Sequence, residues 1–405
     1  MRDTSTGRLV VAATGPAATL YVCGITPYDA THLGHAATYV AFDLLARAWR
    51  DSGLTVRYAS NVTDVDDPLL ERARATGGDW RDLAIEQTAL CAQDMSALGV
   101  VPPDVFRGAV ETVPDVVAAV EQMLARRAAY RVPIEPGAGG ADPGLGDVYA
   151  DLAADPQFGR VARLDRAEMR ALFAQRGGDP DRPGKRDPLD PLLWRRERPG
   201  DPAWDGGALG TGRPGWHIEC AVIARDGLGL PFDVQGGGVD LRFPHHEMST
   251  SHARLLGASG ARTHVHAGMV GLDGEKMSKS LGNLVLVSAL RAQGADPMAI
   301  RLALLAHHYA GDWQWSDSDL TGADARLDRW RTAVAGNGGP DSTAALAAIR
   351  AALADDLDAP TALAAADAWS DAALAGSDWD TRDPDVAGAP GVIARAVNAL
   401  LGVRL

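Results

Sequence analysis

The chain has 405 residues and a formal net charge of -14 at pH 7, with 39 Lys and Arg against 53 Asp and Glu. This length predicts two or three domains rather than one. The acidic balance disfavours nonspecific binding to nucleic acid or to an anionic membrane. No apolar run reaches the roughly 20 residues that span a bilayer, and the amino terminus lacks a signal-peptide pattern, so we expect a cytoplasmic protein.

The first clear pattern in chain order lies at residues 20–43, after a short strand or hairpin predicted at 1–19. An apolar run ends at Cys23, glycine and proline break it, and a helical pattern follows. In a parallel sheet, such a strand–loop–helix unit points the free N–H groups of the helix at its ligand, which favours a nucleotide phosphate. His32 and His35 are three residues apart and share one face of the first helical turn.

A second parallel strand is predicted at 55–63, which is rich in β-branched and aromatic residues. Asn61 and Thr63 lie at its carboxyl end, where ligands bind in such sheets. The acidic run that follows contains Asp64, Asp66 and Asp67. This run has two interpretations: catalytic carboxylates, or the N-cap and first-turn charges of the next helix.

The amino-acid composition and the predicted secondary structure change twice along the rest of the chain. Helical patterns occupy 80–128, and Cys91 within them fits a core position. The segment 129–200 is rich in Pro, Gly and Asp, with one helix at about 165–175, and indicates an insertion between the halves of a doubly wound sheet. Strands and helices then alternate again, and an Ala-rich helical bundle is predicted from residue 321.

Two further stretches carry candidate chemistry. Gly236-Gly237-Gly238-Val239-Asp240 fits either a tight turn or a close backbone approach to a ligand, with Asp240 as an acceptor for ribose hydroxyls. Lys276 and Lys279, two of only three lysines, lie on a glycine-bounded loop. They fit solvated surface lysines, or cations on a mobile loop that stabilise charge moving onto a leaving phosphate.

The three cysteines, Cys23, Cys91 and Cys220, do not form a disulfide framework in a reducing compartment. Cys23, Cys220 and His245 are too far apart in sequence for a local zinc-finger spacing. From spacing alone, a metal site and simple burial both stay open.

Two short motifs resemble the signatures of class I aminoacyl-tRNA synthetases: His32-Leu33-Gly34-His35 and Lys276-Met277-Ser278-Lys279-Ser280. Residues 20–43, 212–220, 233–247 and 268–284 look like cysteinyl-tRNA synthetase and its relative, the cysteine:glucosaminyl-inositol ligase of mycothiol biosynthesis. The resemblance implies an α/β fold, a doubly wound parallel sheet of class I synthetase-type Rossmann architecture with an inserted connective domain and a C-terminal helical bundle. The expected parts are 1–128 and 201–286 for the two halves of the catalytic domain, 129–200 for the connective domain, 287–320 for a segment like a stem-contact region, and 321–405 for the bundle.

The resemblance also implies the site. One zinc ion per chain is expected on Cys23, Cys220 and His245, and ATP is expected as a substrate with Mg2+. Groups expected to stabilise the transition state of adenylate formation are His32, His35, Lys276 and Lys279. Residues expected to line a cysteinyl-adenylate are Cys23, Gly24, Ile25, Thr26, Thr38, Asn61, Val62, Thr63, Trp216, Gly238, Val239, Asp240 and Val270. Without the resemblance, Trp216 and Val270 fit core positions.

The expected zinc has a chemical purpose. With three protein ligands its fourth position stays open, and a thiolate fills that position far better than the hydroxyl of serine, so cysteine is selected without editing. Cysteinyl-tRNA synthetases typically read His-His-Glu-Asn-Glu, the last Glu being a further ligand, whereas this chain reads His245-His246-Glu247-Met248-Ser249. Ser249 is a poor ligand, and the remaining three-ligand site is that of the mycothiol ligases. His246 and Glu247 are expected to orient the site or cap the helix.

Two acceptors are compatible with this chemistry: a tRNA hydroxyl, giving an ester, or the amine of glucosaminyl-inositol, giving an amide. Residues 321–405 hold 7 Arg and no Lys against 12 Asp, which is a poor surface for tRNA. The chain also ends soon after its bundle, where a cysteinyl-tRNA synthetase usually continues into an anticodon-binding domain. The segment 175–180, Gln-Arg-Gly-Gly-Asp-Pro, resembles Glu-Arg-Gly-Gly-Asp-Pro of the ligases, with Gln175 in place of Glu.

We therefore predict a ligase that uses L-cysteine, ATP and glucosaminyl-inositol, has no nucleic-acid or membrane partner, and is a monomer. The alternatives are a compact cysteinyl-tRNA synthetase and a non-catalytic zinc-bearing paralogue that binds tRNA or a protein.

Overall fold

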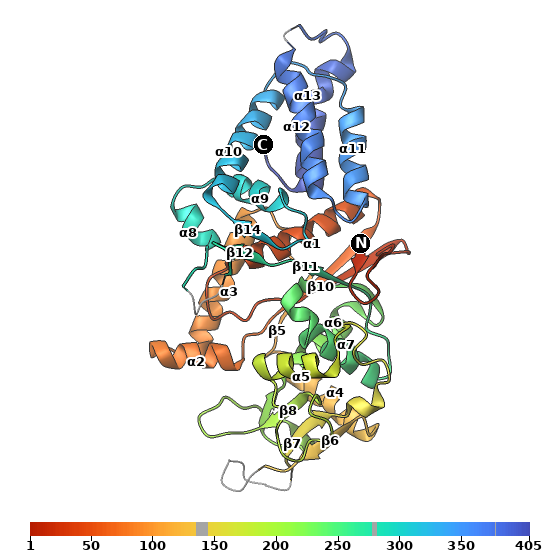
Figure 1. Cartoon of the computed structure of the whole chain (residues 1–405), viewed down its shortest axis with the longest axis vertical. Helices are drawn as coiled ribbons and strands as arrows, with labels where there is room; N and C mark the ends of the chain where they lie inside the picture. Colours follow the sequence, from red (N-terminus) through yellow and green to blue (C-terminus); the bar gives the residue numbers. More distant parts are fainter. Residues whose placement is uncertain (135–144, 278–281, 377) are drawn as a thin grey trace.

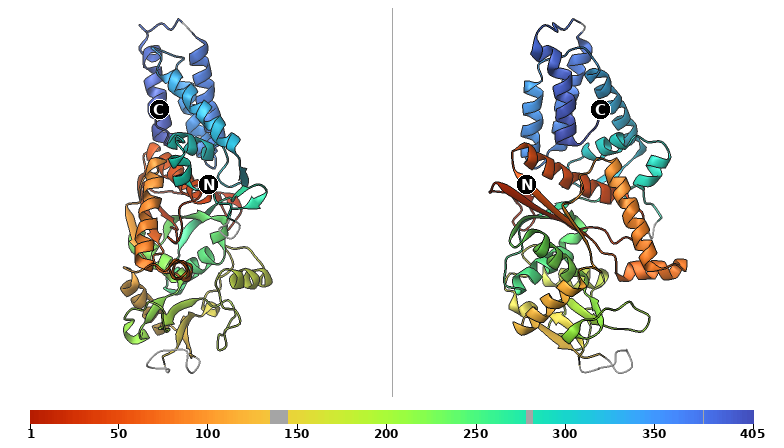
Figure 2. Two further views of the ribbon diagram at one scale, coloured as in Figure 1. Left: turned by 90° about the vertical axis from the view of Figure 1, so that its left-hand side faces the viewer. Right: turned by 180° about the vertical axis from the view of Figure 1, so that it is seen from behind.

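The computed structural model describes residues 1–134, 145–277, 282–376 and 378–405. The molecule is elongated, with three parts along its long axis (Figures 1 and 2). A parallel sheet and its helices lie in the middle, a helical bundle forms one end, and a small antiparallel sheet forms the other.

The central sheet has five parallel strands in the order β11-β10-β3-β4-β5. Their bounds are Ala17–Val22 (β3), Thr55–Val62 (β4), Val105–Gly108 (β5), Phe232–Gly238 (β10) and Ala261–Ala267 (β11). The chain winds outward from β3 to β5 and later returns on the other side of β3, which confirms the predicted doubly wound sheet. The strand order reverses between β3 and β10, so their carboxyl ends flank the crevice where such sheets bind ligands.

Alternation along β3 explains how both faces of this sheet are covered. Leu20 and Val22 belong to the main core with helix α1 (Leu33–Asp51), whereas Tyr21 packs in a cluster with helix α6 (Trp216–Leu228). Successive strand residues point to opposite faces, so α1 and α6 lie on opposite sides of the sheet. A strand buried on both faces is mostly apolar, as the second half of β3, Leu20–Val22, shows.

The antiparallel sheet consists of β6 (Ala129–Val132), β7 (Asp147–Ala150), β8 (Leu192–Arg196) and β9 (Gly212–Pro214). It extends past residue 200, where the sequence analysis placed the end of the insertion. The helices before and around it are α2 (Asp67–Thr76), α3 (Trp80–Ala97), α4 (Val113–Ala125), α5 (Arg166–Gln175) and α7 (His245–Leu255). Asp66 is the N-cap of α2, which confirms the capping interpretation for that residue; Cys91 of α3 is half-buried and packs against the main core.

The end of the molecule opposite the antiparallel sheet is helical. Its helices are α8 (Val287–Ala292), α9 (Pro297–Leu305), α10 (Asp317–Val334), α11 (Thr343–Ala354), α12 (Ala359–Ala375) and α13 (Pro384–Ala396). A fully buried ion pair ties α9 to α1, since Arg301 Nη2 lies 2.5 Å from Asp43 Oδ2. Arg301 also donates to the carbonyls of Leu98 and Leu401. Because a buried charge without its partner is strongly destabilising, this contact fixes how the helical part sits on the catalytic sheet.

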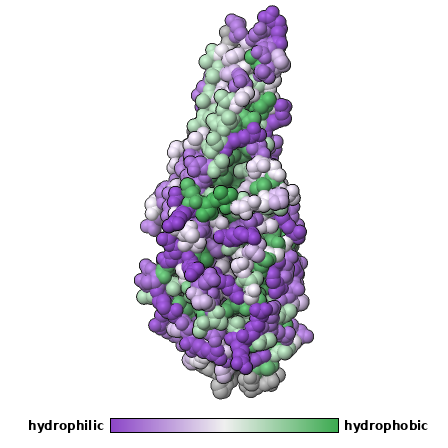
Figure 3. All heavy atoms as spheres, turned by 90° about the vertical axis from the view of Figure 1, so that its right-hand side faces the viewer, coloured by the Kyte–Doolittle hydropathy of each residue, from purple (hydrophilic) through white to green (hydrophobic). Residues whose placement is uncertain are grey.

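Short strands complete the fold. β1 (Arg2–Asp3) and β2 (Arg8–Leu9) form the predicted amino-terminal hairpin, and β12 (Val270–Leu272), β13 (Glu275–Lys276) and β14 (Trp313–Trp315) form a three-stranded sheet. The face of the molecule seen in Figure 3 carries many hydrophilic side chains, with apolar ones scattered among them and gathered most densely near mid-height. Among the described residues, no helix is both long and apolar enough to cross a membrane.

Candidate active site

A cavity of about 1070 Å³ opens at the carboxyl ends of β3 and β10. Its wall includes the loop after β3, the start of α1, the start of α2, the segment after β10 and residues 175–179 of the insertion. This volume exceeds the 300–1,000 Å³ or so of a typical single-ligand pocket. The cavity therefore has room for a nucleotide derivative and a second substrate.

Cys23, Cys220 and His245 come together at this cavity, on the residue after β3, on α6 and at the start of α7. Cys23 and His245 line the cavity, whereas Cys220 lies outside its lining. Their ligand atoms all lie within 4.8 Å of one another, and all three residues are buried. His245 Nε2 is 3.2 Å from Cys220 Sγ. Two sulfurs and one imidazole nitrogen, converging from distant parts of the chain, are a set of atoms that is able to hold a metal ion.

A metal ligand must bind in deprotonated form, and in this cluster only one thiol is favoured as a thiolate, since burial and the neighbouring Cys220 raise the pKa of Cys23 well above its usual range. The hydrogen bond with Cys23, assisted by His245, holds the pKa of the Cys220 thiol well below its usual range. Burial lowers the pKa of both His217 and His246 well below the ordinary value for histidine, so both neighbouring imidazoles are neutral.

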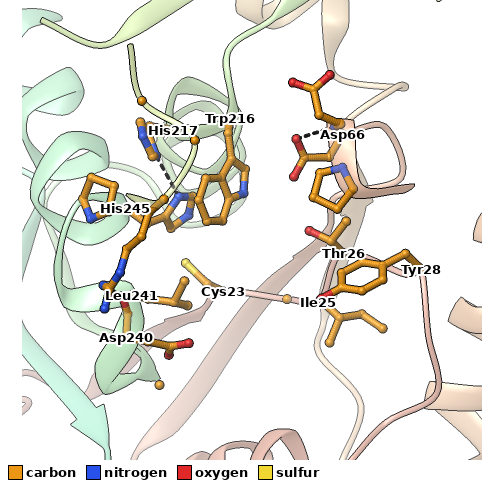
Figure 4. A pocket seen from close by; sticks show the side chains of 18 of the residues that line it. Cys23, Ile25, Thr26, Tyr28, Asp66, Trp216, His217, Asp240, Leu241 and His245 are labelled. Carbon is orange, nitrogen blue, oxygen red and sulfur yellow. Dashed lines mark hydrogen bonds between the residues drawn. The ribbon is translucent and has the colours of Figure 1, made fainter. Parts of the chain in front are cut away.

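A second layer of histidines surrounds the cluster. His217 Nδ1 lies 3.0 Å from His245 Nδ1, as drawn in Figure 4, and His246 Nε2 lies 3.2 Å from Cys23 Sγ. His246 Nδ1 is in turn 2.8 Å from His266 Nε2. Such contacts fix ring orientation and tautomer around a metal site. The orienting role expected of His246 fits this geometry, whereas those of His217 and His266 were not predicted; the one signal is that six of the ten histidines fall between residues 217 and 266.

Glu247 and Ser249, which follow His246 on α7, hold neighbouring segments in place. The Glu247 carboxylate accepts hydrogen bonds from the backbone N–H groups of Val161 and Ala162, both at 2.8 Å, and so anchors the insertion to α7. Ser249 Oγ accepts from Gln235 Nε2 at 3.0 Å and donates to the carbonyl of His246. Neither residue belongs to the described three-residue cluster.

His32 and His35 lie at the amino end of α1 and line the cavity. His32 is the N-cap, its Nδ1 accepting from the Gly34 N–H at 3.1 Å, and the two rings stack with centroids 3.9 Å apart. The first turn of α1 holds no acidic residue, so its positive dipole end stays available to an anion.

The predicted adenylate residues divide into two sets. Those that line the cavity are Cys23, Gly24, Ile25, Thr26, Thr38, Trp216, Gly238, Asp240 and Val270. Among the described residues, Asn61, Val62, Thr63 and Val239 lie outside that lining. Asn61 instead supports the loop from behind, because its Oδ1 accepts from the N–H of Gly24 at 2.8 Å and from the hydroxyl of Tyr21 at 2.9 Å.

Trp216 lies at the cavity rather than in the core, where its sequence context alone would place it. Its side chain is only partly buried, and its ring lies 4.5 Å from that of His245.

The glycines of β10 have a packing role. A Cβ at Gly236 would lie 2.4 Å from the Phe42 ring, and one at Gly237 would lie 2.8 Å from the His246 ring. Close packing thus demands glycine at these two positions, whether or not a ligand approaches the strand.

The second signature is only partly visible. Met277 and Val270 line the cavity, and residue 276 belongs to β13. Lys279 lies outside the described residues, and of Lys276 only the backbone is described.

The insertion supplies a charged wall that the sequence did not predict. Arg213 and Arg195 pair with Asp67 of α2, and Arg182 and Arg198 pair with Asp147. In the resemblance segment, Arg176 donates to the carbonyls of Asp240 and Phe243, and so pins the loop that carries Asp240. Asp179 pairs with Lys185 at 2.9 Å and accepts from the Tyr149 hydroxyl.

This fold and site define a class I synthetase-type catalytic domain. The model of the family "tRNA synthetases class I (C) catalytic domain" matches residues 10–325. A solved structure of Mycobacterium tuberculosis methionyl-tRNA synthetase in complex with methionyl-adenylate superposes with a TM-score of 0.66, covering 95% of this chain and 92% of that one. At 16% identity, this likeness concerns the fold alone.

Curated relatives narrow the class. A Sanguibacter keddieii protein named L-cysteine:1D-myo-inositol 2-amino-2-deoxy-alpha-D-glucopyranoside ligase is 72% identical, over all of this chain and 95% of its own length. A Streptomyces coelicolor protein of the same name is 58% identical, again over all of this chain and 95% of its own length. The chain belongs to this family of class I synthetase-like ligases.

Proposed function

We propose that the protein is an AMP-forming ligase that activates L-cysteine with ATP and transfers the cysteinyl group to the amine of 1D-myo-inositol 2-amino-2-deoxy-alpha-D-glucopyranoside. The observation that carries this proposal is the cluster of Cys23, Cys220 and His245, two members of which line the same cavity as the paired histidines His32 and His35. Relatives of 56–72% identity that cover the full chain bear the name of that ligase, which supports the choice of acceptor.

We assign zinc to the cluster, because two sulfurs and one imidazole within 4.8 Å suit it better than they suit a hard cation. Bound there, zinc supplies an open coordination position that favours a thiolate over a hydroxyl. Serine, which lacks a thiol, is then rejected without an editing site. His217 and His246 hold the ligand side chains in place.

The first half-reaction joins cysteine to the nucleotide. The cysteine carboxylate attacks the α-phosphorus of ATP, and pyrophosphate leaves. We assign His32, His35 and the amino end of α1 to the phosphates, and Asp240 to the ribose hydroxyls. Lys276 and Lys279, with Mg2+, stabilise the charge that moves onto pyrophosphate.

In the second half-reaction, the acceptor amine attacks the carbonyl carbon of the mixed anhydride and AMP leaves; holding both reactants in one cavity supplies much of the rate. We expect a monomer that acts on small molecules in the reducing cytoplasm, without nucleic acid. The helical part 321–405 supports this, since its 12 Asp outnumber its 7 Arg and would repel a phosphate backbone.

A direct assay tests the proposal. Purified protein receives ATP and cysteine with either the amino-sugar inositol or tRNA, and AMP release is followed. We expect release to depend on the amino-sugar inositol. Stimulation by tRNA alone would favour a cysteinyl-tRNA synthetase instead, and the absence of ATP–pyrophosphate exchange with cysteine would rule out both enzymes.

A further inference from the structure

Three of the carboxylates that line the cavity are neutralised by ion pairs within the described residues. Asp67 pairs with Arg195 and Arg213, and Asp147 pairs with Arg182 and Arg198. Asp179 pairs with Lys185. These pairs build the wall, and none of the three carboxylates presents an uncompensated negative charge to a ligand.

Asp66 differs from them. In the part of the chain that the structure describes, no Lys or Arg nitrogen lies within 4.0 Å of its carboxylate. Its Oδ1 accepts one hydrogen bond, from the Asp67 N–H at 2.8 Å, as the N-cap of α2. Its Oδ2 has no described hydrogen-bond partner. The side chain is half-buried and lines the cavity, so a negative charge faces the cavity without a fixed counterion.

The position of Asp66 is also distinctive. In Figure 4 it lies on the same side as Thr26, across the cavity from Trp216, His245 and Cys23. The next residue, Asp67, contacts Arg195 of β8 and Arg213 of β9. Asp66 therefore faces the side of the cavity that holds Cys23 and His245, next to the wall built by the antiparallel sheet.

Resting on the proposed function, we propose that Asp66 is the base of the second half-reaction: its carboxylate binds the ammonium group of the acceptor and takes a proton from it before attack. An amino sugar enters largely as an ammonium ion, which has no lone pair for attack. Transfer of one proton to Asp66 Oδ2 frees that lone pair. The C–N bond then forms, the C–O bond to the AMP phosphate breaks with its electron pair on AMP, and the nitrogen loses its second proton to solvent.

The electrostatic setting supports this role. Burial is the main cause that raises the pKa of Asp66 to about 6; the adjacent Asp67 also raises it, whereas the Asp67 N–H, Arg213 and His245 lower it. A base with a pKa near the working pH is efficient in proton transfer. Ionisation of the Asp66 carboxyl is costly in the empty cavity and becomes more favourable once a cation binds beside the carboxylate.

The α-ammonium group of L-cysteine has the same chemistry, and the test separates the two. The variant Asp66→Asn removes the charge and keeps an N-cap side chain. ATP–pyrophosphate exchange with cysteine reports the first half-reaction, and a single turnover of preformed cysteinyl-adenylate with the amino-sugar inositol reports the second. We expect transfer to slow by about 100-fold, whereas exchange falls far less.

A matched control is Asp79→Asn, since Asp79 is the N-cap of α3, does not line the cavity, and should leave transfer intact. Hydroxylamine, which is largely unprotonated at neutral pH, should react with the adenylate of Asp66→Asn nearly as fast as with that of the wild type. Asp66→Ser, another capping residue, replaces Asp66→Asn if the latter folds poorly. Equal losses in exchange and transfer would assign Asp66 to the cysteine ammonium and overturn the proposal, as would undiminished transfer. Failure of the wild-type protein to catalyse exchange would refute the proposed function instead.

Discussion

The two sides of the cavity are held together by different kinds of interaction. Around Cys23 and Cys220 the wall is buried, the imidazoles of His217 and His246 are neutral, and hydrogen bonds between side chains hold it together. The wall made by α2 and the antiparallel sheet is charged and partly exposed, and it is held by arginine–aspartate pairs.

This difference between the two walls indicates how much each single residue contributes to substrate recognition. In the proposed function the three ligand atoms of the buried cluster hold one metal ion that recognises one substrate atom, so each of the three residues should be indispensable. Exposed ion pairs each contribute only about 0–1 kcal/mol, so the charged wall should tolerate single changes at its more exposed residues, such as Arg195. The following substitutions test the contrast.

The largest effect is expected from Cys220→Ser. A hydroxyl does not ionise as a thiol does and is a poor ligand for a soft metal site, so metal content and cysteine activation should fall together. The loss in exchange activity should exceed the 10- to 100-fold or so that is typical of outer contacts around a metal. Cys91→Ser is the matched control, because Cys91 lies on α3 outside the cavity lining. Metal analysis that finds full occupancy in Cys220→Ser would contradict the assignment.

A smaller effect is expected from His217→Ala, which removes the imidazole 3.0 Å from His245 Nδ1 and leaves all three cluster residues in place. Freed from this contact, His245 loses a fixed tautomer and orientation, and affinity for the metal should fall by about 10- to 100-fold. Competition with a chelator measures the affinity of the variant and of the wild-type protein for the metal. Unchanged affinity would mean that His217 only fills space behind the cluster.

The sequence predicted the parts of this design that depend on local pattern. The strand at 55–63, the helix near 165–175 and the amino-terminal hairpin all confirm predictions from periodicity and turn residues. The cap of α2 at Asp66 is equally local. The metal cluster was different, because spacing alone left burial and ligation open, and only family resemblance joined its three residues.

The features that the sequence did not predict depend on how elements far apart in the chain pack together. Helix α6 is buried on most of its surface, so its sequence gave no reason to single out His217. Arg213 meets Asp67 only because β9 lies in the antiparallel sheet beside α2. The glycines of β10 were interpreted as a turn or a ligand approach, whereas the fit of Phe42 and His246 against them follows from the packing of α1 and α7.

Asp66→Asn should also raise the stability of the folded protein at pH 7.5. The pKa of Asp66 in the folded chain, about 6, lies above its ordinary value of 3.8, so the stability linked to protonated Asp66 is complete below pH 3.8 and is lost as pH rises through 6. Partial exposure and the lost interaction with the dipole of α2 reduce the gain to about 1 kcal/mol. Urea unfolding at pH 7.5 and pH 4 measures it. We expect a gain at the higher pH only; equal gains at both would point to a cause other than the charge.

The smallest effect is expected from Arg195→Ala, on the charged wall. Arg195 lies 3.5 Å from both Asp67 and Asp201, and its side chain is 31% exposed. Arg213 and Arg74 also pair with these two aspartates, so loss of Arg195 leaves neither carboxylate without a cation. We expect the free energy of unfolding to fall by less than about 1 kcal/mol, with little change in KM for the acceptor. Comparison with Arg195→Ala in an Asp67→Asn background isolates the pair energy. A coupling of several kcal/mol, or a large rise in KM, would show that this wall recognises its ligand through single residues, as the buried cluster does.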